Sequence, residues 1–521
     1  MFEAHSKASN IIMAKDIDLT NINYVNSTDA TLVVVSTPVN NTMVGVFIIN
    51  NHHVNVRTIV RVVGYTSDDP VPGWCSNRLG VWPRPGLSLE TVHSNHLIRL
   101  NFSLAASNNY KDCINVRNDL NYEVYHRYLD TGTGWGRHHH RDAEHDLFLG
   151  LKKFKDIEGI GKWGRKVASL GPHLDRLVFA AYPPAGAVFA VVAIAENGSS
   201  VYGLGHSYGC VLDTISGHCL NDVAQPLVQI FCACSLFAGL LLAFAGHKFF
   251  LASQIIFGFY AGVYLGYILL NVFFSLNFNF MFFLVMACGL CFAITIVSIW
   301  IFLGIPVLSV LLPTMELGVI LASTILYLPA TNTMSLTVNL HYWLVFICLV
   351  LAAPVCLLAF THKAHILASV LVGTTLIVLP VDFYLGTALK YVFLNVVRRS
   401  FVHEYREAIL VPLFESEELI LLACGLAVAA LALLCQLLVQ RKRPPFPPSP
   451  FQQWRWKREA DRDVVDDTEP LLGSVDIGDA TNEETVVRPA VVGYIQNREA
   501  RSRKKIRENI RTSTPVNEVN N

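Results

Sequence analysis

Apolar residues dominate seven long stretches in the second half of the chain. An α-helix rises about 1.5 Å per residue, so roughly 20 apolar residues are needed to cross a hydrocarbon core of about 30 Å. Each stretch meets this requirement, and the pattern predicts seven transmembrane helices. The predicted spans are 226–246, 249–270, 281–303, 305–328, 342–361, 364–389 and 418–439. Only Gly304 and Pro306 mark the break between the third and fourth spans, and a single bent helix there would reduce the count to six.

The first half has a different pattern, in which short runs rich in β-branched and aromatic residues alternate with turn sequences. Within 97–104, apolar and polar residues alternate as in a strand with one buried face, and Asn101 falls on the polar side. One stretch, 143–155, has helical spacing instead. The predicted strands are 31–37, 43–49, 54–65, 97–104, 120–129, 176–182 and 187–195. We therefore predict an α+β membrane protein, with a β-sandwich of one or two units before a seven-helix bundle.

Charged residues divide the chain at the same places. They make up only 15% of the 521 residues, whereas soluble domains contain roughly 25%. After Arg441 the chain becomes polar and highly charged, which predicts a mostly disordered tail. The expected domains are a β-rich domain outside the cytosol at 1–225, the helical bundle at 226–440 and a cytosolic tail at 441–521. The formal net charge is zero, so the overall charge gives no support for nucleic-acid binding.

Basic residues near the ends of the spans predict the orientation in the membrane. Arg441, Lys442 and Arg443 follow the last span, which places that end in the cytosol. With seven crossings the N-terminal half then lies outside. The loop 390–417 opposes this orientation, because it would also lie outside and yet contains four basic residues. All four glycosylation sequons precede the first span, where modification requires the lumen: Asn26, Asn40, Asn101 and Asn197. We therefore expect a multi-pass glycoprotein of the cell membrane with its N-terminus outside.

Export of the N-terminal half also bears on its cysteines and its first residues. Four of the twelve cysteines precede the first span: Cys75, Cys113, Cys210 and Cys219. An even set in an oxidising compartment predicts two disulfides, and the short spacing of Cys210 and Cys219 favours a local loop that leaves Cys75 with Cys113. Four free buried thiols are the alternative. Met1–Thr20 lacks the basic and apolar regions of a signal peptide, so we expect a signal sequence upstream of this start.

Two carboxylates, Glu316 and Asp382, fall within the predicted spans. An acidic side chain in hydrocarbon is costly and is therefore a candidate for function. Pro380 lies two residues before Asp382, and a helix break there would expose backbone carbonyls suited to proton or cation handling. The alternative is a protonated or hydrogen-bonded group that holds a kink.

Small residues and loop residues suggest three further features, each with an alternative. Gly258, Gly262 and Gly266 share one face of the second span, either for close helix packing or to line a path for a lipid or substrate. Apolar residues within 401–409 have helical spacing, and predict a short helix on the outer membrane surface or against the ectodomain. His138, His139, His140 and His145 resemble a metal cluster, but without fixed ligand spacing we expect a solvated loop and no cofactor.

The tail contains two recognisable short motifs. Asp467, Leu471 and Leu472 form the acidic-dileucine pattern that endocytic adaptors bind, which predicts endosomal and lysosomal traffic. Residues 444–450 are proline-rich and predict polyproline II, as a spacer or as a ligand for an aromatic groove.

Several sequence segments, taken in order, resemble the family of transmembrane 7 superfamily member 3. The segments are 72–75, 121–125, 208–219, 243–250, 381–384, 394–399 and 443–450, and the resemblance extends from about residue 30 to 460. The membrane part is also similar to the wider group that includes transmembrane protein 198. The resemblance implies a glycosylated seven-span protein of the cell surface with a cleaved signal peptide, linked to restraining cell stress and cell death. It brings no catalytic residues, although Asp382 stands where the family has an acidic residue.

These features favour a non-enzymatic receptor or adaptor. Its expected partners are the lipid bilayer, an extracellular ligand or protein of unknown identity, and endocytic adaptors at the tail. The alternative is a transporter or channel that uses Asp382. An enzyme is disfavoured because candidate His, Asp and Ser groups within the spans are scattered, and rhodopsin-like coupling is disfavoured because no acidic-Arg-aromatic triplet follows the third span.

Overall fold

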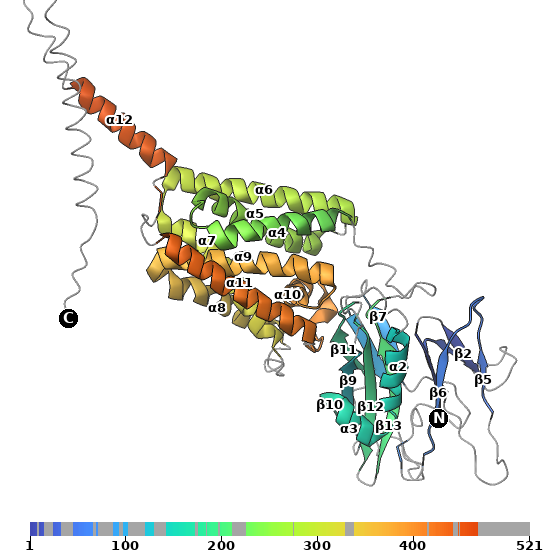
Figure 1. Cartoon of the computed structure of the whole chain (residues 1–521). Coiled ribbons are helices and arrows are strands. Elements are labelled where there is room, and N and C mark those ends of the chain that lie inside the picture. Colours follow the sequence, from blue (N-terminus) through green and yellow to red (C-terminus); the bar gives the residue numbers. More distant parts are fainter. Residues whose placement is uncertain are drawn as a thin grey trace, which may run out of the picture. The chain divides into compact units, whose positions relative to one another are not determined.

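The structure is a computed structural model of the whole chain (Figure 1). It describes residues 1–7, 10–14, 24–32, 45–65, 69–70, 87–92, 97–102, 120–129, 142–171, 176–183, 185–195, 198–210, 226–274, 276–328, 338–413, 416–440, 446–447 and 449–466. The chain forms two compact units, residues 1–452 and 453–521.

The first β domain, residues 1–65, contains two small antiparallel sheets. One has the order β4-β1-β6, from β1 (Phe2–Ser6), β4 (Asp29–Leu32) and β6 (Thr58–Val62). The other has the order β3-β2-β5, from β2 (Ile11–Ala14), β3 (Tyr24–Ser27) and β5 (Phe47–Ile49). Both sheets contribute to one core, made by Ala4, Ile11, Met13, Ala30 and Leu32. Strands β1 and β2 lie within the first 20 residues, where the sequence pattern predicted none.

The second β domain, residues 69–210, combines two sheets with two helices. The larger sheet has the order β10-β9-β12-β13, from β9 (Asn121–Tyr128), β10 (Arg165–Leu170), β12 (Ala187–Ala195) and β13 (Gly198–Ser207). The smaller has the order β11-β8-β7, from β7 (Leu87–Val92), β8 (Leu97–Phe102) and β11 (Arg176–Ala180). Strand β12 is buried on both faces, because the smaller sheet packs on one side and helices α2 (Asp142–Lys153) and α3 (Ile157–Trp163) on the other.

Within the described residues, six segments are long and apolar enough to cross a membrane. They comprise α4 (Pro226–Ala245), α5 (Phe250–Phe273), α6 (Phe278–Leu303), α7 (Pro306–Tyr327), a 47-residue segment Asn339–Leu385, and α11 (Ser416–Gln440). The 47-residue segment contains α8 (Asn339–Leu357), the turn η5 (Leu358–Phe360) and α9 (Thr361–Leu385). Gly304 takes a left-handed φ of 61° and Pro306 begins α7, so the break between the third and fourth spans separates two helices.

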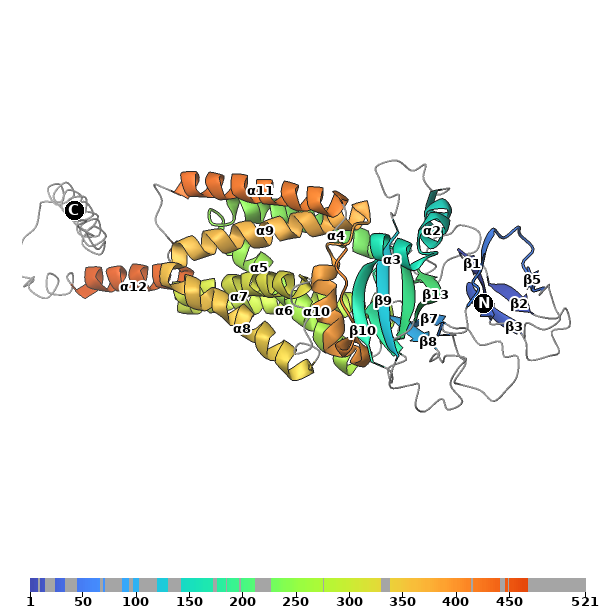
Figure 2. The same cartoon turned by 90° about the horizontal axis from the view of Figure 1, so that it is seen from below.

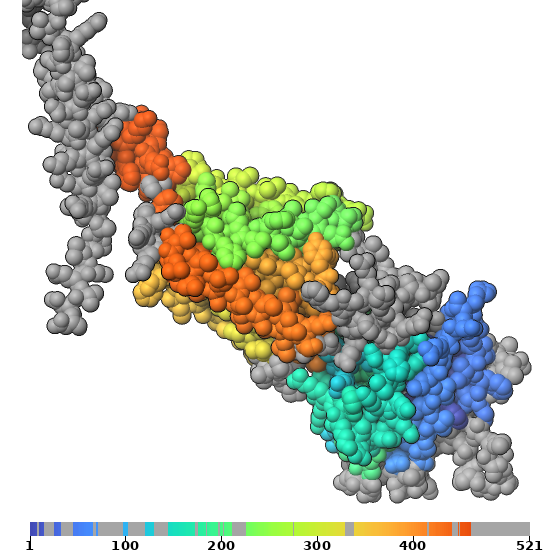
Figure 3. Space-filling model, in the orientation of Figure 1, coloured from blue at the N-terminus to red at the C-terminus, as the bar shows by residue number. Residues whose placement is uncertain are grey.

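The outer surface of the bundle is apolar, as lipid contact requires. Phe237, Phe273 and Val355 each expose more than two thirds of their surface. Helices α4 and α11 adjoin on the face shown in Figure 3. Pairs of helices pack most closely as α5 with α6, α4 with α9, and α7 with α8.

Two predicted elements differ from the structure. The helix predicted at 401–409 is wrong: α10 (Tyr391–Phe401) ends where it should begin, and a 3-10 turn, η6 (His403–Arg406), follows. The tail begins with a helix, α12 (Pro450–Asp466), where a disordered segment was expected. Charged residues dominate α12, and its Arg455 and Glu459 form an ion pair of 2.9 Å one turn apart, a spacing that stabilises an exposed helix.

Candidate functional site

Helix α9 ends next to Asp382, whose carboxylate accepts several hydrogen bonds from residues that follow it in the chain. Gly386, with a left-handed φ of 75°, ends the helix and donates its N–H to the Asp382 carbonyl at 2.9 Å. The fully buried Asp382 carboxylate then accepts hydrogen bonds from Thr387 Oγ1 at 2.6 Å, Leu389 N at 2.7 Å and Lys390 N at 3.0 Å. The last two N–H groups belong to the two residues immediately before α10. Asp382 therefore fixes the turn that connects α9 to α10, as a capping carboxylate does.

Helix α10 presents one face to the second β domain. Tyr391, Asn395 and Arg398 have the spacing of one helical stripe, and they meet three consecutive residues, 181–183. The Tyr391 hydroxyl donates to the Pro183 carbonyl at 2.5 Å, and Arg398 Nη1 donates to the Ala181 carbonyl at 2.9 Å. Asn395 Nδ2 lies 3.2 Å from the Tyr182 hydroxyl. Figure 2 shows α10 between the bundle and the sheet that contains β9 and β10.

The chain after α10 pairs with the edge of the smaller sheet. Ile409 N donates to the Val178 carbonyl at 2.8 Å, and Ala180 N donates to the Ile409 carbonyl at 3.1 Å. These bonds make a parallel bridge between Phe179 and Ile409. Strand β11 is at the edge of its sheet, so the pairing covers backbone groups that an edge would leave exposed.

Apolar and ionic contacts complete this contact surface. Glu404 accepts two hydrogen bonds from Arg99, each of 2.9 Å, and lies 3.7 Å from Arg176. The Tyr128 hydroxyl donates to the Val411 carbonyl at 2.7 Å. The shared apolar cluster contains Leu97, Val178, Ala180, Tyr182, Val402, Tyr405, Ala408 and Leu413, among others. We call the contact between residues 386–413 and the second β domain the junction.

The junction also touches the ends of several bundle helices. Ala388 N donates to Glu418 Oε1, at the start of α11, with a separation of 3.3 Å. Leu413 N lies 3.4 Å from the Tyr327 hydroxyl at the end of α7. The Arg399 guanidinium lies 4.0 Å from the centre of the Tyr342 ring near the start of α8. The junction therefore contacts the ends of α7, α8 and α11.

The basic loop residues have partners of their own within this arrangement. Arg398 binds a carbonyl of the second β domain, Arg399 lies over an aromatic ring, and Lys390 Nζ donates to the Thr387 carbonyl at 3.0 Å. The two interpretations of the loop, a membrane-surface helix or a helix packed on the ectodomain, are thus resolved in favour of the ectodomain. Three of the four basic side chains of this loop thus make contacts within the protein.

Glu316 lies apart from the junction, in the middle of α7 and three residues after Pro313, which is inside the helix. Its Oε1 is shielded from solvent and has no hydrogen-bond partner among the described residues. Among the described residues, Asp382 and Glu316 form no hydrogen bond with each other. The structure therefore separates the two predicted carboxylates into one saturated group and one unsatisfied group.

The three predicted glycines of α5 face α6. An added Cβ would lie 2.8 Å from Ala293 Cα at Gly258, and 2.9 Å from Gly289 Cα at Gly262. At Gly266 it would lie 2.9 Å from the Cys288 Cβ. These glycines lie at a close contact between two helices, with no room between the backbones. This geometry favours the helix-packing alternative over the alternative in which the glycines line a path for a lipid or substrate.

A cluster of buried polar residues at the opposite end of α9 had no distinguishing sequence pattern. His247 Nδ1 and His365 Nδ1 lie 3.2 Å apart, with the Ser369 and Ser253 hydroxyls 3.4 and 3.5 Å from the His365 ring nitrogens. Gln254 is fully buried, and neither of its amide atoms has a hydrogen-bond partner among the described residues. Two of these polar residues are 118 positions apart in the chain, so only the packing of α9 against the α4–α5 turn brings them together.

Family models match most of the chain. Residues 232–437 match the TM7S3/TM198-like domain, residues 70–213 the second immunoglobulin-like domain of TM7SF3-like proteins, and residues 1–65 their N-terminal immunoglobulin-like domain. The chain belongs to the transmembrane 7 superfamily member 3 family. The two β domains are its immunoglobulin-like (Ig-like) domains, and the junction joins the second of them to the TM7S3/TM198-like domain.

Curated relatives in this family are distant in sequence. Transmembrane 7 superfamily member 3 of Rattus norvegicus and that of Mus musculus are each 26% identical over 415 residues, covering 78% of this chain and 72% of the relative. The Homo sapiens protein is 24% identical over 416 residues, covering 78% and 71%. No solved structure matches the chain. The family resemblance predicted from short segments is thereby confirmed.

The remaining predicted site residues of this family member fall partly on the described residues. Asn26 is exposed on β3 and Asn101 is half-buried on β8, and His145 is exposed on α2. Cys210 is buried after β13 and is disulfide-bonded. The other predicted residues lie outside the described residues: Asn40, Asn197, Cys75, Cys113, Cys219, His138, His139, His140, Asp467, Leu471 and Leu472.

Proposed function

We propose that the chain is a non-enzymatic receptor or adaptor of the cell membrane, in which the Ig-like domains bind an extracellular partner and the junction transmits binding to the bundle. The chain crosses the bilayer seven times, with its N-terminus outside and its C-terminus in the cytosol. Glycans on the sequons, two disulfides and adaptor-dependent endosomal traffic belong to the same proposal, as does a role in cell survival and stress attenuation.

Two observations support seven crossings. A continuous helix of 47 residues would be about 70 Å long, more than twice the hydrocarbon thickness. The turn η5 interrupts it, and both α8 and α9 pack on α7, so each counts as one crossing. The curated relatives also carry the words "transmembrane 7 superfamily" in their names, which agrees with this count.

The junction is the observation that carries the receptor proposal. It fastens the second Ig-like domain to the bundle by backbone pairing at Ile409, by buried hydrogen bonds from α10, and by a shared apolar cluster. Beneath it, the Asp382 carboxylate connects α10 to α9. A partner that shifts the second Ig-like domain would therefore also shift the ends of the bundle helices. If a flexible linker joined the domain to the bundle instead, the same shift would not reach the helices.

A transporter or channel that uses Asp382 has less support. The hydrogen bonds that Asp382 accepts all come from its own helix end and the turn that follows. A pocket of about 190 Å³ between α6 and α7 is apolar and is lined by residues such as Ile296, Trp300 and Leu312, and it contains neither Asp382 nor Glu316.

Proximity labelling of the full-length chain tests the receptor proposal. A labelling enzyme is attached at the ectodomain in one experiment and at the tail in another, with the normal chain and with Ile409→Pro. Proline removes the N–H that bonds to Val178, so we expect the ectodomain label to capture the same partner and the tail label to capture a changed set of proteins. The matched control is Leu410→Ala, which leaves the pairing N–H in place. An unchanged tail set in Ile409→Pro, or no ectodomain partner above an unrelated multi-pass control, would contradict the proposal.

A further inference from the structure

Strands β1 and β4 of the sheet β4-β1-β6 are buried on both faces, and one of these faces is polar. Ala4, Ala30 and Leu32 point into the core of the N-terminal Ig-like domain. The opposite face carries Glu3 and His5 on β1, paired in register with Thr31 and Asp29 on β4, and all four are at least 93% buried. This face packs against β13 of the second Ig-like domain, where an isolated domain would present it to water.

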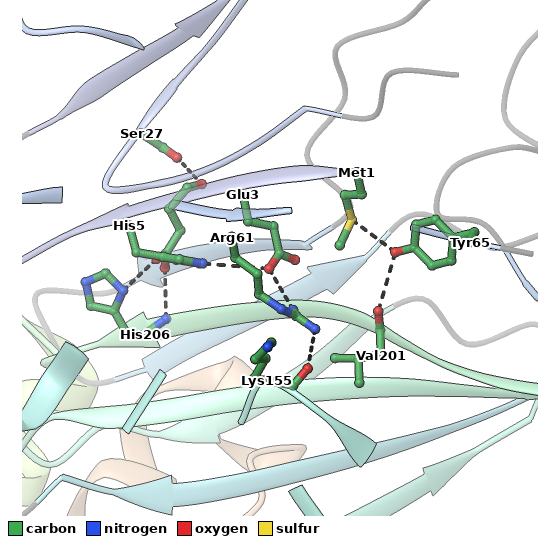
Figure 4. Close-up of polar contacts among 10 residues, drawn as sticks. Met1, Glu3, His5, Ser27, Arg61, Tyr65, Lys155, Val201 and His206 are labelled. Carbon is green, nitrogen blue, oxygen red and sulfur yellow. Dashed lines mark hydrogen bonds and ion pairs between the residues drawn. The ribbon is translucent and has the colours of Figure 1, made fainter. Parts of the chain in front are cut away.

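One carboxylate on this face bonds to both domains. Asp29 Oδ1 lies 2.7 Å from His5 Nδ1 and 2.5 Å from His206 Nδ1, and Asp29 Oδ2 accepts a hydrogen bond of 2.8 Å from His206 N. His206 lies on β13 and is 4% exposed. One side-chain atom from each of the three residues lies within 4.8 Å of the other two. Figure 4 shows His5 and His206 close together, with Glu3 and Arg61 beside them.

The cluster has more polar atoms than partners. Glu3 Oε2 accepts a hydrogen bond of 2.8 Å from Arg61 Nη1 and lies 3.9 Å from His5 Nε2. Glu3 Oε1, His5 Nε2 and the Thr31 hydroxyl are shielded from solvent, and none has a hydrogen-bond partner among the described residues. Unpaired buried groups of this kind are uncommon, and an ion is one of the explanations for them.

Negative charge exceeds positive charge among the side chains of the cluster. Two buried carboxylates, Glu3 and Asp29, lie beside one guanidinium of the described residues, that of Arg61. An uncompensated buried charge costs several kcal/mol. A bound cation would compensate that charge.

We propose that His5, Asp29 and His206 bind one divalent transition-metal ion, of which Zn²⁺ fits best, and that this ion fastens the N-terminal Ig-like domain to the second. Two imidazoles and a carboxylate are a common zinc ligand set, in which water takes the fourth position. Glu3 Oε2 lies 3.9 Å from His5 Nε2, the ring nitrogen that does not face Asp29, so Glu3 would orient the His5 ring and not bind the ion. A tetrahedral zinc site holds its ligand atoms roughly 3.3 Å apart. Asp29 Oδ1 lies 2.5 Å from His206 Nδ1 and 2.7 Å from His5 Nδ1. These two distances need to increase by less than about 1 Å to admit the ion. This site goes beyond the proposed receptor function and does not depend on it.

Zinc titration of the purified full-length chain, stripped with a chelator and kept in detergent, tests the proposal. We expect one site that is absent in His206→Ala and strongly weakened in Asp29→Asn. The loss of zinc affinity in these variants should exceed the roughly 10- to 100-fold loss that follows the removal of a group that only orients a metal ligand. His145→Ala, on the exposed face of α2, is the matched control and should bind as the normal chain does.

Cobalt substitution distinguishes this site from the free cysteines of the helices. Nitrogen and oxygen ligands give a Co²⁺ spectrum without the thiolate charge-transfer bands that cysteine ligands would produce. A chain carrying His138→Ala, His139→Ala and His140→Ala removes the other histidine-rich segment from competition. His206→Gln keeps the backbone N–H that bonds to Asp29, so it serves if His206→Ala does not fold.

The metal should also stabilise the contact between the Ig-like domains. Added Zn²⁺ is expected to raise the midpoint of thermal unfolding of the normal chain and of His145→Ala, but not of His206→Gln. Equal zinc binding by the normal chain and His206→Gln, or no site in the normal chain tighter than about 10 μM (roughly 7 kcal/mol of binding free energy), would overturn the proposal. The cluster would then be an ion-pair network balanced by a proton.

Discussion

Replacing Asp382 with alanine is expected to destabilise the full-length protein by about 4 kcal/mol. The substitution removes the acceptor of three hydrogen bonds at a fully buried site. Each hydrogen bond to a charged group contributes roughly 1.5–3 kcal/mol, and the buried N–H groups of Leu389 and Lys390 would be left unpaired. The measurement is equilibrium unfolding of the detergent-solubilised chain, followed by helical circular dichroism.

Two milder variants control this prediction. Asp382→Asn keeps an acceptor oxygen and should cost about half as much, while Thr387→Val removes one hydrogen bond and should cost about 1.5 kcal/mol. If the free energy of unfolding of Asp382→Ala lay within about 0.5 kcal/mol of that of the normal chain, the carboxylate would not hold the turn. If Asp382→Asn instead abolished an ion flux at unchanged stability, the transporter alternative would gain the support that the geometry denies it.

Leucine at Gly373 is expected to prevent α4 and α9 from packing. An added Cβ alone would lie 2.5 Å from Ala243 N and 2.9 Å from Ala243 Cα, and both are backbone atoms that cannot rotate away. The same turn of α4 is held from its other side, because Gln436 of α11 donates hydrogen bonds of 3.1 and 2.6 Å to the Leu242 and Ala243 carbonyls. We expect less than about one tenth of the normal amount of folded protein at the cell surface, since a loss above 4 kcal/mol exceeds much of a typical stability.

Gly425 provides the matched control for this prediction. Its added Cβ would meet the Val378 Cγ2 at 2.8 Å, which is a side-chain methyl and gives way at a lower cost than the backbone atoms at Gly373. Gly425→Ala should therefore reach the surface in near-normal amounts, while Gly373→Ala should already be impaired. Surface biotinylation measures both, and equal surface levels of Gly373→Leu and the normal chain would contradict the packing.

Sequence alone located the apolar helices well and their polar partners poorly. The last span, predicted at 418–439, is α11 at Ser416–Gln440, because the cost of leaving hydrocarbon depends on composition that a window can read. Asp382 was recognisable as a costly group, but its partners are backbone N–H groups of the following turn, which have no sequence signature. The pattern at 401–409 indicated a helix whose apolar residues instead cover the edge strand β11.

Residues distant in the chain account for the clusters that the sequence did not reveal. His5 and Asp29 are 24 residues apart and Asp29 and His206 are 177 apart, with no spacing that a metal motif would fix. Strand β1 lies within the first 20 residues, and its sequence does not look like a strand with one buried apolar face. The reason is that both faces of β1 are buried and one of them is charged. Tertiary packing, rather than local pattern, decides such positions.

Disulfide cross-linking between Phe179→Cys and Ile409→Cys is the most direct test of the junction. The two residues are paired in a parallel bridge, so their Cα atoms lie at the separation of neighbouring strands, about 4.8 Å, which a disulfide can span. In intact cells we expect this pair to cross-link under mild oxidation, while Phe179→Cys with Val62→Cys, on the exposed face of β6, does not. Absence of the cross-link in chains that reach the surface normally would show that the ectodomain is not fastened to the bundle at residues 386–413.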